Sequence, residues 1–159
     1  LYVGRFREEK GYASLIKIYK KLDINSSLTM VGNDYKYLKK KNYPKNKNIK
    51  IISEISNLRE LIKYYDKCDI FILPSYVEAY PQVILESLSR LRPIIIFNEI
   101  KYLKKTFPFG LLNCDRTSES LTDNILNIKK NYNKIQLQIL RKKIFTLESF
   151  HRDMNKIFS

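Results

Sequence analysis

The fold is decided by the segment IFILPSYVEAYPQVILESL, which occupies residues 70–88. Its first four residues are apolar, too few for a helix, and suit a strand that is buried on both faces. Further on, Ile84, Leu88 and then Leu91 recur at the spacing of one helix face. Pro81 fits the first turn of that helix, where its missing N–H group would have no partner. The segment therefore predicts a strand, a loop and a helix in succession.

The same succession recurs along the chain. Apolar runs that suit buried strands occur at residues 1–6, 28–31, 49–52, 70–73 and 94–97, with a weaker run near Leu111. Helical spacing separates them, as in the faces formed by Leu15, Ile18, Tyr19 and Leu22 and by Leu58, Leu61, Ile62 and Tyr65. Because parallel strands need helical crossovers, this alternation predicts an α/β domain with a Rossmann-like, doubly wound parallel sheet and helices on both faces.

The last part of the chain has a different pattern. From residue 117 the strand runs stop, and apolar residues follow helical spacing at Leu121, Ile125 and Ile128, at Ile135 and Ile139, and at Phe150, Met154 and Ile157. We therefore expect an α/β core at about residues 1–116 and a helical C-terminal tail at about residues 117–159. The length of 159 residues suits one domain. Because Leu1 already opens a strand run, we expect the chain to be cut from a larger protein.

Composition narrows the class of protein without choosing a ligand. The longest apolar run, around residues 93–97, is far shorter than the roughly 20 residues that span a bilayer. Cys68 and Cys114 form no CxxC unit, so we expect small buried hydrophobes in a reducing compartment and a cytoplasmic protein. The net charge of +14 would attract nucleic acid, anionic lipid or phosphorylated small molecules, or would simply be a solvated surface.

Two carboxylates border the end of the strand at residues 70–73. Glu78 lies in the loop after it, and Glu86 lies in the following helix. Ligands of parallel sheets bind beyond the carboxyl ends of the strands. A carboxylate is a natural acceptor for the vicinal hydroxyls of a ribose or a hexose, and the free N–H groups of a helix start favour a phosphate between them. The pattern indicates a site for a phosphorylated sugar.

This spacing of glutamates resembles the E-x7-E motif of the retaining GT-B glycosyltransferases, particularly glycosyltransferase family 4. Further stretches are similar to motifs of that family, in the same order: Tyr2-Val3-Gly4-Arg5 followed by Lys10-Gly11, then Met30-Val31-Gly32, then the run from Tyr65 to Ser75. The resemblance covers about residues 1–97 motif by motif and the closing helices by pattern. It implies one half of a GT-B fold, with the acceptor-binding N-terminal domain outside this sequence.

The resemblance also implies a donor site. Arg5 and Lys10 would bind the donor diphosphate, Glu86 the ribose hydroxyls and Glu78 the transferred sugar, so that Glu78, Arg5 and Lys10 form the catalytic group. Further donor-binding positions are Gly4, Ser53, Ile55, Tyr80, Gln82 and Val83, with the backbone at residues 53–55 facing the base. Fixed cations aimed at the leaving diphosphate stabilise the transition state. We therefore expect a metal-independent site without a cofactor.

Several family glycines are replaced in this sequence. Ser53, Ala79 and Leu91 stand at three of these positions, and no glycine occurs at residues 98–101, where relatives have a glycine-rich loop that contacts the transferred sugar. Pro81 removes one backbone donor from the phosphate cradle. The single histidine, His151, lies in the tail, where we expect no chemistry.

The implied function is retaining transfer of a hexose from a uridine- or guanosine-linked nucleotide sugar to a glycan or lipid-linked acceptor. The setting would be bacterial surface polysaccharide or lipopolysaccharide assembly, with part of the basic surface resting on the anionic inner face of the membrane. Two alternatives stay open. One is a non-catalytic nucleotide-sugar-binding or regulatory subunit. The other is a basic nucleic-acid-binding module, which is disfavoured because the lysines follow no single element.

Overall fold

The computed structural model describes residues 1–33 and 46–141 of the chain. Within these residues the strands are β1 (Tyr2–Val3), β2 (Leu28–Gly32), β3 (Ile49–Ser53), β4 (Phe71–Leu73), β5 (Ile94–Phe97) and β6 (Leu111–Cys114). The α-helices are α1 (Tyr12–Tyr19), α3 (Leu58–Lys67), α4 (Gln82–Ser89), α5 (Leu103–Thr106) and α6 (Ser118–Arg141), with short 3-10 helices η1 (Glu8–Lys10) and η2 (Asn98–Ile100). Every predicted strand run contains a strand or overlaps one, and helices follow in alternation.

The strands form two parallel ladders that meet at β1 and β4. One ladder has the order β1-β2-β3, and the other has the order β4-β5-β6. Two hydrogen bonds join them, because the Ile72 N–H group donates to the Leu1 carbonyl oxygen at 2.8 Å and the Leu1 amino group donates to the Ile70 carbonyl oxygen at 2.7 Å. The spatial order is thus β3-β2-β1-β4-β5-β6. This confirms the doubly wound prediction, and the order reverses between β1 and β4, where such folds bind ligands.

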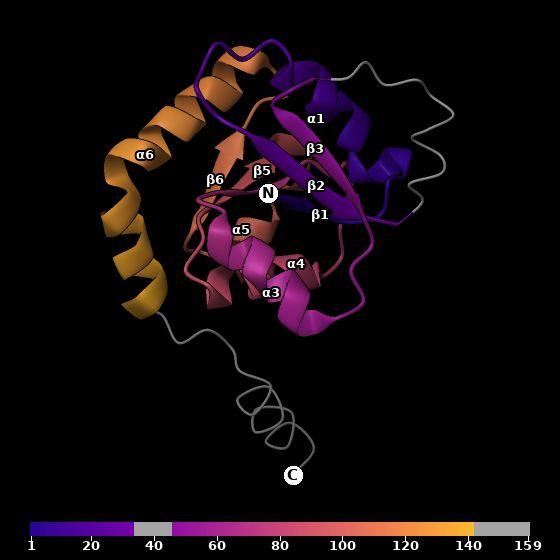
Figure 1. Ribbon diagram of the computed structural model, residues 1–159. Coiled ribbons are helices and arrows are strands. Elements are labelled where there is room, and N and C mark those ends of the chain that lie inside the picture. Colours follow the sequence, from indigo (N-terminus) through magenta and orange to yellow (C-terminus); the bar gives the residue numbers. More distant parts are fainter. Residues whose placement is uncertain (34–45, 142–159) are drawn as a thin grey trace.

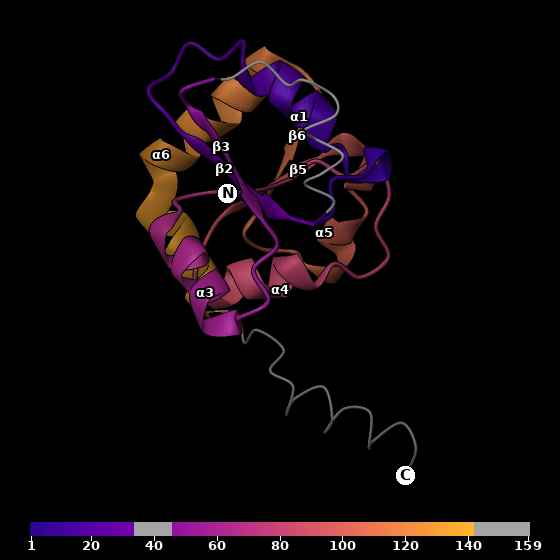
Figure 2. The ribbon, with the colours of Figure 1, turned by 45° about the vertical axis from the view of Figure 1, so that its right-hand side comes forward.

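Helices cover both faces of the strands (Figures 1 and 2). The helix α1 packs on one face, where its apolar side chains join those of β2 in one hydrophobic core. The helices α3, α4 and α5 pack on the other face and contribute Tyr65, Ile84, Leu88 and Leu103 to a second core. Because β5 is apolar at every position, it supplies residues to both cores. This explains why the central strands read as continuous apolar runs.

The helix α6 crosses from one layer to the other, as Figures 1 and 2 show. Its first half inserts Leu121 and Ile128 into the core on the α1 face, whereas Ile139 near its end belongs to the core on the α3 and α4 face. A non-helical residue, Asn131, marks a kink between the two halves. The tail therefore begins as one kinked helix. Phe150, Met154, Ile157 and His151 lie outside the described residues.

The two ends of α4 each have a distinctive residue. Pro81 is the residue before the helix, with an extended ψ of 112°, and the first helical residue is Gln82. At the other end, Leu91 has a φ of 57°, a left-handed conformation that glycine adopts most easily. The glycine that the family resemblance implies at this position would fit the same conformation. Among the described residues, no helix has the length and apolarity needed to cross a bilayer.

Candidate functional site

The loops that follow β1 and β4 lie against each other at the reversal of strand order. The Tyr76 N–H group donates a hydrogen bond to the Glu9 carbonyl oxygen at 2.9 Å. Gly11 has a φ of 66°, and a Cβ atom at this position would lie 1.9 Å from the Pro74 carbonyl oxygen. Only glycine combines this conformation with so close an approach. The Lys10-Gly11 pair of the sequence motif therefore brings the loop after β1 onto the end of β4.

This close approach brings Lys10 and Glu78 together. The Lys10 Nζ atom and the Ser75 Oγ atom both lie 2.7 Å from the Glu78 Oε1 atom. The side chain of Glu78 is 9% exposed and that of Lys10 is 21% exposed, so the ion pair is largely shielded from water. Among the described residues, no hydrogen bond is found to the second oxygen, Oε2. An ion pair thus stands where the sequence predicted a sugar-binding carboxylate and a phosphate-binding cation.

The backbone of Glu78 is held by a residue that the sequence reasoning did not select. The Tyr102 hydroxyl accepts a hydrogen bond from the Glu78 N–H group at 3.0 Å and donates another to the Glu78 carbonyl oxygen. Tyr102 lies two residues after η2 and directly follows residues 98–101, where the family resemblance implies a glycine-rich loop. No spacing or motif marks Tyr102 in the sequence, because its contact joins residues that are 24 positions apart.

The side chain of Glu86 is oriented by a hydrogen bond from Tyr65 on α3. Its Oε2 atom accepts a hydrogen bond from the Tyr65 hydroxyl at 2.6 Å, while Oε1 has no hydrogen bond within the described part. Tyr65 is 1% exposed, and its ring stacks on that of Phe71 with centroids 5.7 Å apart. Burial, together with the hydrogen bond to Glu86, raises the pKa of Tyr65 well above its usual range. The hydroxyl therefore remains a donor at every physiological pH.

Arg116 connects the segments around the site, although the sequence reasoning missed it too. Its guanidinium lies 4.0 Å from the ring centroid of Tyr76 and 4.5 Å from that of Phe97. The Nη1 atom donates to the Pro74 carbonyl oxygen at 3.0 Å and to the hydroxyl of Ser14 on α1 at 2.6 Å. The Nε atom donates to the Glu99 carboxylate at 2.8 Å, and this bond lowers the pKa of Glu99. The end of β4, α1 and η2 thus share one half-buried cation.

The remaining predicted positions take no part in these hydrogen bonds. Arg5 is exposed, and no hydrogen bond or ion pair of its guanidinium is found in the described residues. The Gly4 N–H group donates to the Val31 carbonyl oxygen, and the Tyr80 ring centroid lies 5.5 Å from that of Phe107. The other positions differ in exposure: Ser53, at the end of β3, and Gln82 are exposed, whereas Ile55 and Val83 are half-buried. Hydrogen bonds of the described residues bring together Lys10 and Glu78, whereas Arg5 and Glu86 make no hydrogen bond with that pair.

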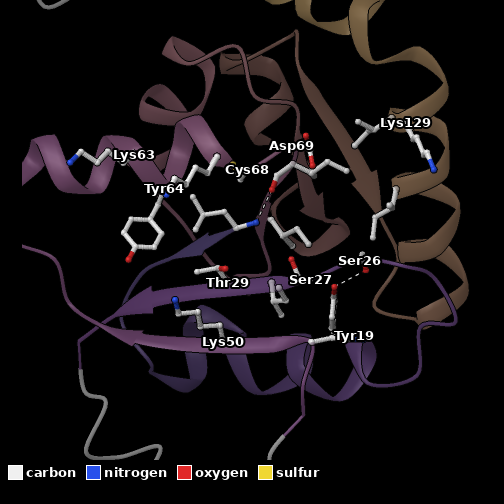
Figure 3. Close-up of a pocket in the computed structure, with 18 of the residues that line it drawn as sticks. Tyr19, Ser26, Ser27, Thr29, Lys50, Lys63, Tyr64, Cys68, Asp69 and Lys129 are labelled. Atoms are coloured by element: carbon white, nitrogen blue, oxygen red, sulfur yellow. Dashed lines mark hydrogen bonds between the residues drawn. The ribbon is translucent and has the colours of Figure 1, made fainter.

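A cavity of about 1340 Å³ opens elsewhere, at the edge where the strands begin. Figure 3 shows Thr29 and Lys50 of the sheet on one side of it and Lys63 and Tyr64 of α3 on the other. The amino group of Leu1 also lies there. None of the predicted donor-site residues lines this cavity. The site at the opposite ends of the strands is favoured because it holds the ion pair and the paired loops at the reversal of strand order.

The cysteines and possible metal ligands add little to this site. Both thiols are free; Cys114 is buried as expected, whereas Cys68 is only half-buried. In the part of the chain that the structure describes, no three His, Cys, Asp or Glu side chains gather as metal ligands would. Metal independence stays a prediction.

Comparison with known proteins gives the family. The family model described as glycosyl transferases group 1 matches residues 1–142. The chain belongs to this family. The glycosyltransferase resemblance noted from the motifs is confirmed at this level.

Individual relatives of this group 1 glycosyltransferase chain agree with the family. The capsular polysaccharide biosynthesis glycosyltransferase CapH of Staphylococcus aureus is 30% identical over 146 residues, which cover 82% of this chain and 40% of CapH. The crystal structure of Anabaena HepE in complex with UDP-glucose has a TM-score of 0.73 at 16% identity, covering 99% of this chain and 48% of HepE. The chain therefore spans less than half the length of these proteins.

A solved fragment matches the size of this group 1 chain more evenly. The C-terminal domain of the group 1 family protein LpcC from Francisella tularensis has a TM-score of 0.60 at 20% identity. The match covers 88% of this chain and 80% of that domain. At these identities the structural likeness shows the GT-B type of α/β fold.

Proposed function

We propose that this chain is the C-terminal, donor-binding domain of a retaining family 4 glycosyltransferase. The full-length protein would move a hexose from a nucleotide-diphosphate sugar to a glycan or lipid-linked acceptor held by its N-terminal domain. The observation that carries the proposal is the Lys10–Glu78 ion pair at the reversal of strand order, with Glu86 on the helix that leaves the same loop. The even match with the C-terminal domain of LpcC supports the domain assignment.

Each polar group has a role in this proposal. Arg5, exposed and without an internal partner in the described residues, and Lys10 bind the diphosphate, helped by the free N–H groups at the start of α4. Glu86 accepts hydrogen bonds from the ribose, and Glu78 accepts them from the transferred sugar. The remaining donor contacts come from Gly4, Ser53, Ile55, Tyr80, Gln82 and Val83.

The chemistry follows from where charge develops. As the glycosidic bond breaks, negative charge grows on the leaving diphosphate, and fixed cations stabilise that charge more than the ground state. Arg5 and Lys10 would supply this without a metal ion. By analogy with the family, the leaving phosphate takes the acceptor proton on the same face of the sugar, so that configuration is retained.

Donor and setting are inferred from the relatives. HepE was crystallised with UDP-glucose, which favours a uridine-linked donor over a guanosine-linked one. The name of CapH supports a role in surface polysaccharide assembly. We therefore propose a cytoplasmic enzyme that contacts the inner face of the membrane through part of its basic surface.

Calorimetry tests the donor site directly. The full-length protein is titrated with UDP, GDP and ADP and with their sugars, alongside Glu86→Ala and Arg5→Ala. We expect one nucleotide family to bind, with affinity reduced at least about tenfold in each variant, since each removes a charge-assisted contact. Arg59→Ala, which removes an exposed arginine of α3 at the opposite edge, is the matched control. Nucleotide affinity that is unchanged in both site variants would overturn the proposal.

Activity separates an enzyme from a non-catalytic subunit. Glu78→Gln keeps the size of the side chain and removes its charge. If the protein transfers sugar, kcat should fall by about 100-fold or more, because the contact is made at the reacting sugar. A wild-type protein that binds donor but shows neither transfer nor donor hydrolysis would favour the non-catalytic subunit.

A further inference from the structure

The carboxylates of Glu78 and Glu86 have the same pattern of hydrogen bonds. Each carboxylate has one oxygen bound by a fully buried hydroxyl: Tyr65, 1% exposed, donates to the Glu86 Oε2 atom at 2.6 Å, and Ser75, 0% exposed, donates to the Glu78 Oε1 atom at 2.7 Å. The other oxygen of each carboxylate has no hydrogen bond among the residues that the structure describes. Each glutamate therefore has an anchored oxygen and an open one.

An anchor on one oxygen decides where the other oxygen points. A free carboxylate rotates about its last bond, and each orientation presents its lone pairs differently. A hydrogen bond from a rigid, buried donor fixes that rotation before any ligand arrives, and in a dry setting the bond is stronger than in water. Orientation that is fixed in advance lowers the entropic cost of binding and of reaction.

Both anchors are themselves rigid. The ring of Tyr65 stacks on Phe71, and its carbonyl oxygen accepts a hydrogen bond from the Arg92 Nε atom at 3.0 Å. Ser75 directly follows the buried Pro74, whose carbonyl oxygen is bound by Arg116. These supports come from elements other than the loop that carries Glu78, so the two hydroxyls hold their places when the site is empty.

We propose that Tyr65 and Ser75 are positioning residues that divide recognition of the donor between them. Tyr65 turns the open oxygen of Glu86 toward the ribose, and Ser75 turns the open oxygen of Glu78 toward the transferred sugar. The inference rests on the proposed function, since it assigns the two carboxylates to the two ends of a nucleotide sugar.

The two anchors are unequal in strength. Glu78 Oε1 also contacts the Lys10 ammonium, so it keeps one partner when the Ser75 hydroxyl is removed. Glu86 Oε2 has Tyr65 as its one hydrogen-bond donor within the described residues. Loss of the Tyr65 hydroxyl should therefore leave Glu86 Oε2 without this donor, whereas loss of the Ser75 hydroxyl leaves Glu78 Oε1 with Lys10.

The ribose half is tested with Tyr65→Phe, which removes only the hydroxyl and keeps the stacked ring. The probes are UDP, GDP and ADP with their 2′-deoxy and 3′-deoxy counterparts, titrated into the full-length protein. We expect wild-type protein to favour the ribose form of its nucleotide by about tenfold, and Tyr65→Phe to favour it by no more than about threefold. Tyr64→Phe, on the same helix, should keep the wild-type preference.

A double substitution shows whether Tyr65 acts through Glu86. In the Glu86→Ala background, adding Tyr65→Phe should leave nucleotide affinity unchanged within about twofold, because the group that it positions is gone. A Tyr65→Phe variant that folds and keeps the full preference for ribose would overturn this half of the inference.

The sugar half is tested with Ser75→Ala and steady-state kinetics on UDP-glucose, UDP-galactose, UDP-N-acetylglucosamine and GDP-mannose. We expect kcat to fall about fivefold with the ribose preference intact, whereas Tyr65→Phe should raise KM and leave kcat within about twofold. If both variants change KM and kcat alike, the proposed division is wrong. If wild-type protein itself ignores the ribose hydroxyls, the assignment of Glu86 fails, and the proposed function fails with it.

Discussion

Gly11 lies where the loop after β1 packs against the end of β4. In a Gly11→Ala variant, the added Cβ would lie 1.9 Å from the Pro74 carbonyl oxygen, and the φ of 66° would be strained. We expect the free energy of unfolding to fall by at least about 2 kcal/mol, as measured in urea. Gly4→Ala is the control, since its Cβ would approach only the side chain of Tyr2, with the hydroxyl at 3.1 Å and the nearest ring carbon at 3.3 Å. Equal losses in the two variants would contradict this reading.

Tyr102 gives a second prediction at this scale. Its hydroxyl binds both backbone groups of Glu78, and its side chain is 43% exposed, so the contact is partly open to water. Tyr102→Phe should lower kcat for sugar transfer about threefold to tenfold while nucleotide affinity stays constant, because only the sugar end of the site loses support. Kinetics and calorimetry on the same preparation check this. A change confined to nucleotide affinity would show that Tyr102 serves the other end.

The family resemblance implied Lys10 and Glu78 as site residues, and the structure gives a physical reason for their proximity. They follow β1 and β4, which are parallel neighbours whose carboxyl ends meet at one edge. Tyr65, Tyr102 and Arg116 could not be found in that way. Their contacts join residues 21, 24 and 102 positions apart, and they are made by residue types that occur in any core or on any surface.

At the level of elements, buried strands were the most predictable part, because a strand covered on both faces must be apolar at every position. The strand run predicted at residues 1–6 is longer than β1, which covers Tyr2–Val3. After Val3 the chain leaves the ladder, and the Phe6 N–H group donates instead to the Asn33 carbonyl oxygen in the loop after β2. In the tail, helical spacing at residues 121–128 and again at residues 135–139 predicted helix, and the structure joins both stretches in α6 with a kink at Asn131.

The end of α4 offers a test of local strain. Leu91 has a φ of 57° and is half-buried, so Leu91→Gly loses packing while it relieves backbone strain of about 1–2 kcal/mol. We expect these effects to cancel within about 1 kcal/mol in the free energy of unfolding. Leu88→Ala, on the same helix and fully buried, should cost about 2–5 kcal/mol. If Leu91→Gly cost as much as Leu88→Ala, packing would outweigh strain at this position.

For the molecule as a whole, the net charge of +14 makes membrane contact testable. Each Lys or Arg near an anionic bilayer contributes about 1 kcal/mol, and salt screens this attraction. We expect the full-length protein to sediment with phosphatidylcholine vesicles increasingly as phosphatidylglycerol is added, and to be released by salt. Binding that ignores lipid charge would argue against the peripheral contact. Nucleic acid affinity that stays high as salt rises would instead revive the nucleic-acid alternative.

The pairing of Lys10 with Glu78 has a consequence for which anions the empty protein attracts. An ammonium that already has a counter-ion binds chloride or a single phosphate weakly, because the incoming anion must compete with a carboxylate at 2.7 Å. A diphosphate carries more charge, and in the proposed site it also contacts Arg5. We therefore expect the gap in affinity between UDP and UMP to narrow in Glu78→Gln, where Lys10 has lost its resident anion. The ion pair would then lower the affinity of the site for cellular phosphate more than its affinity for the diphosphate of the donor.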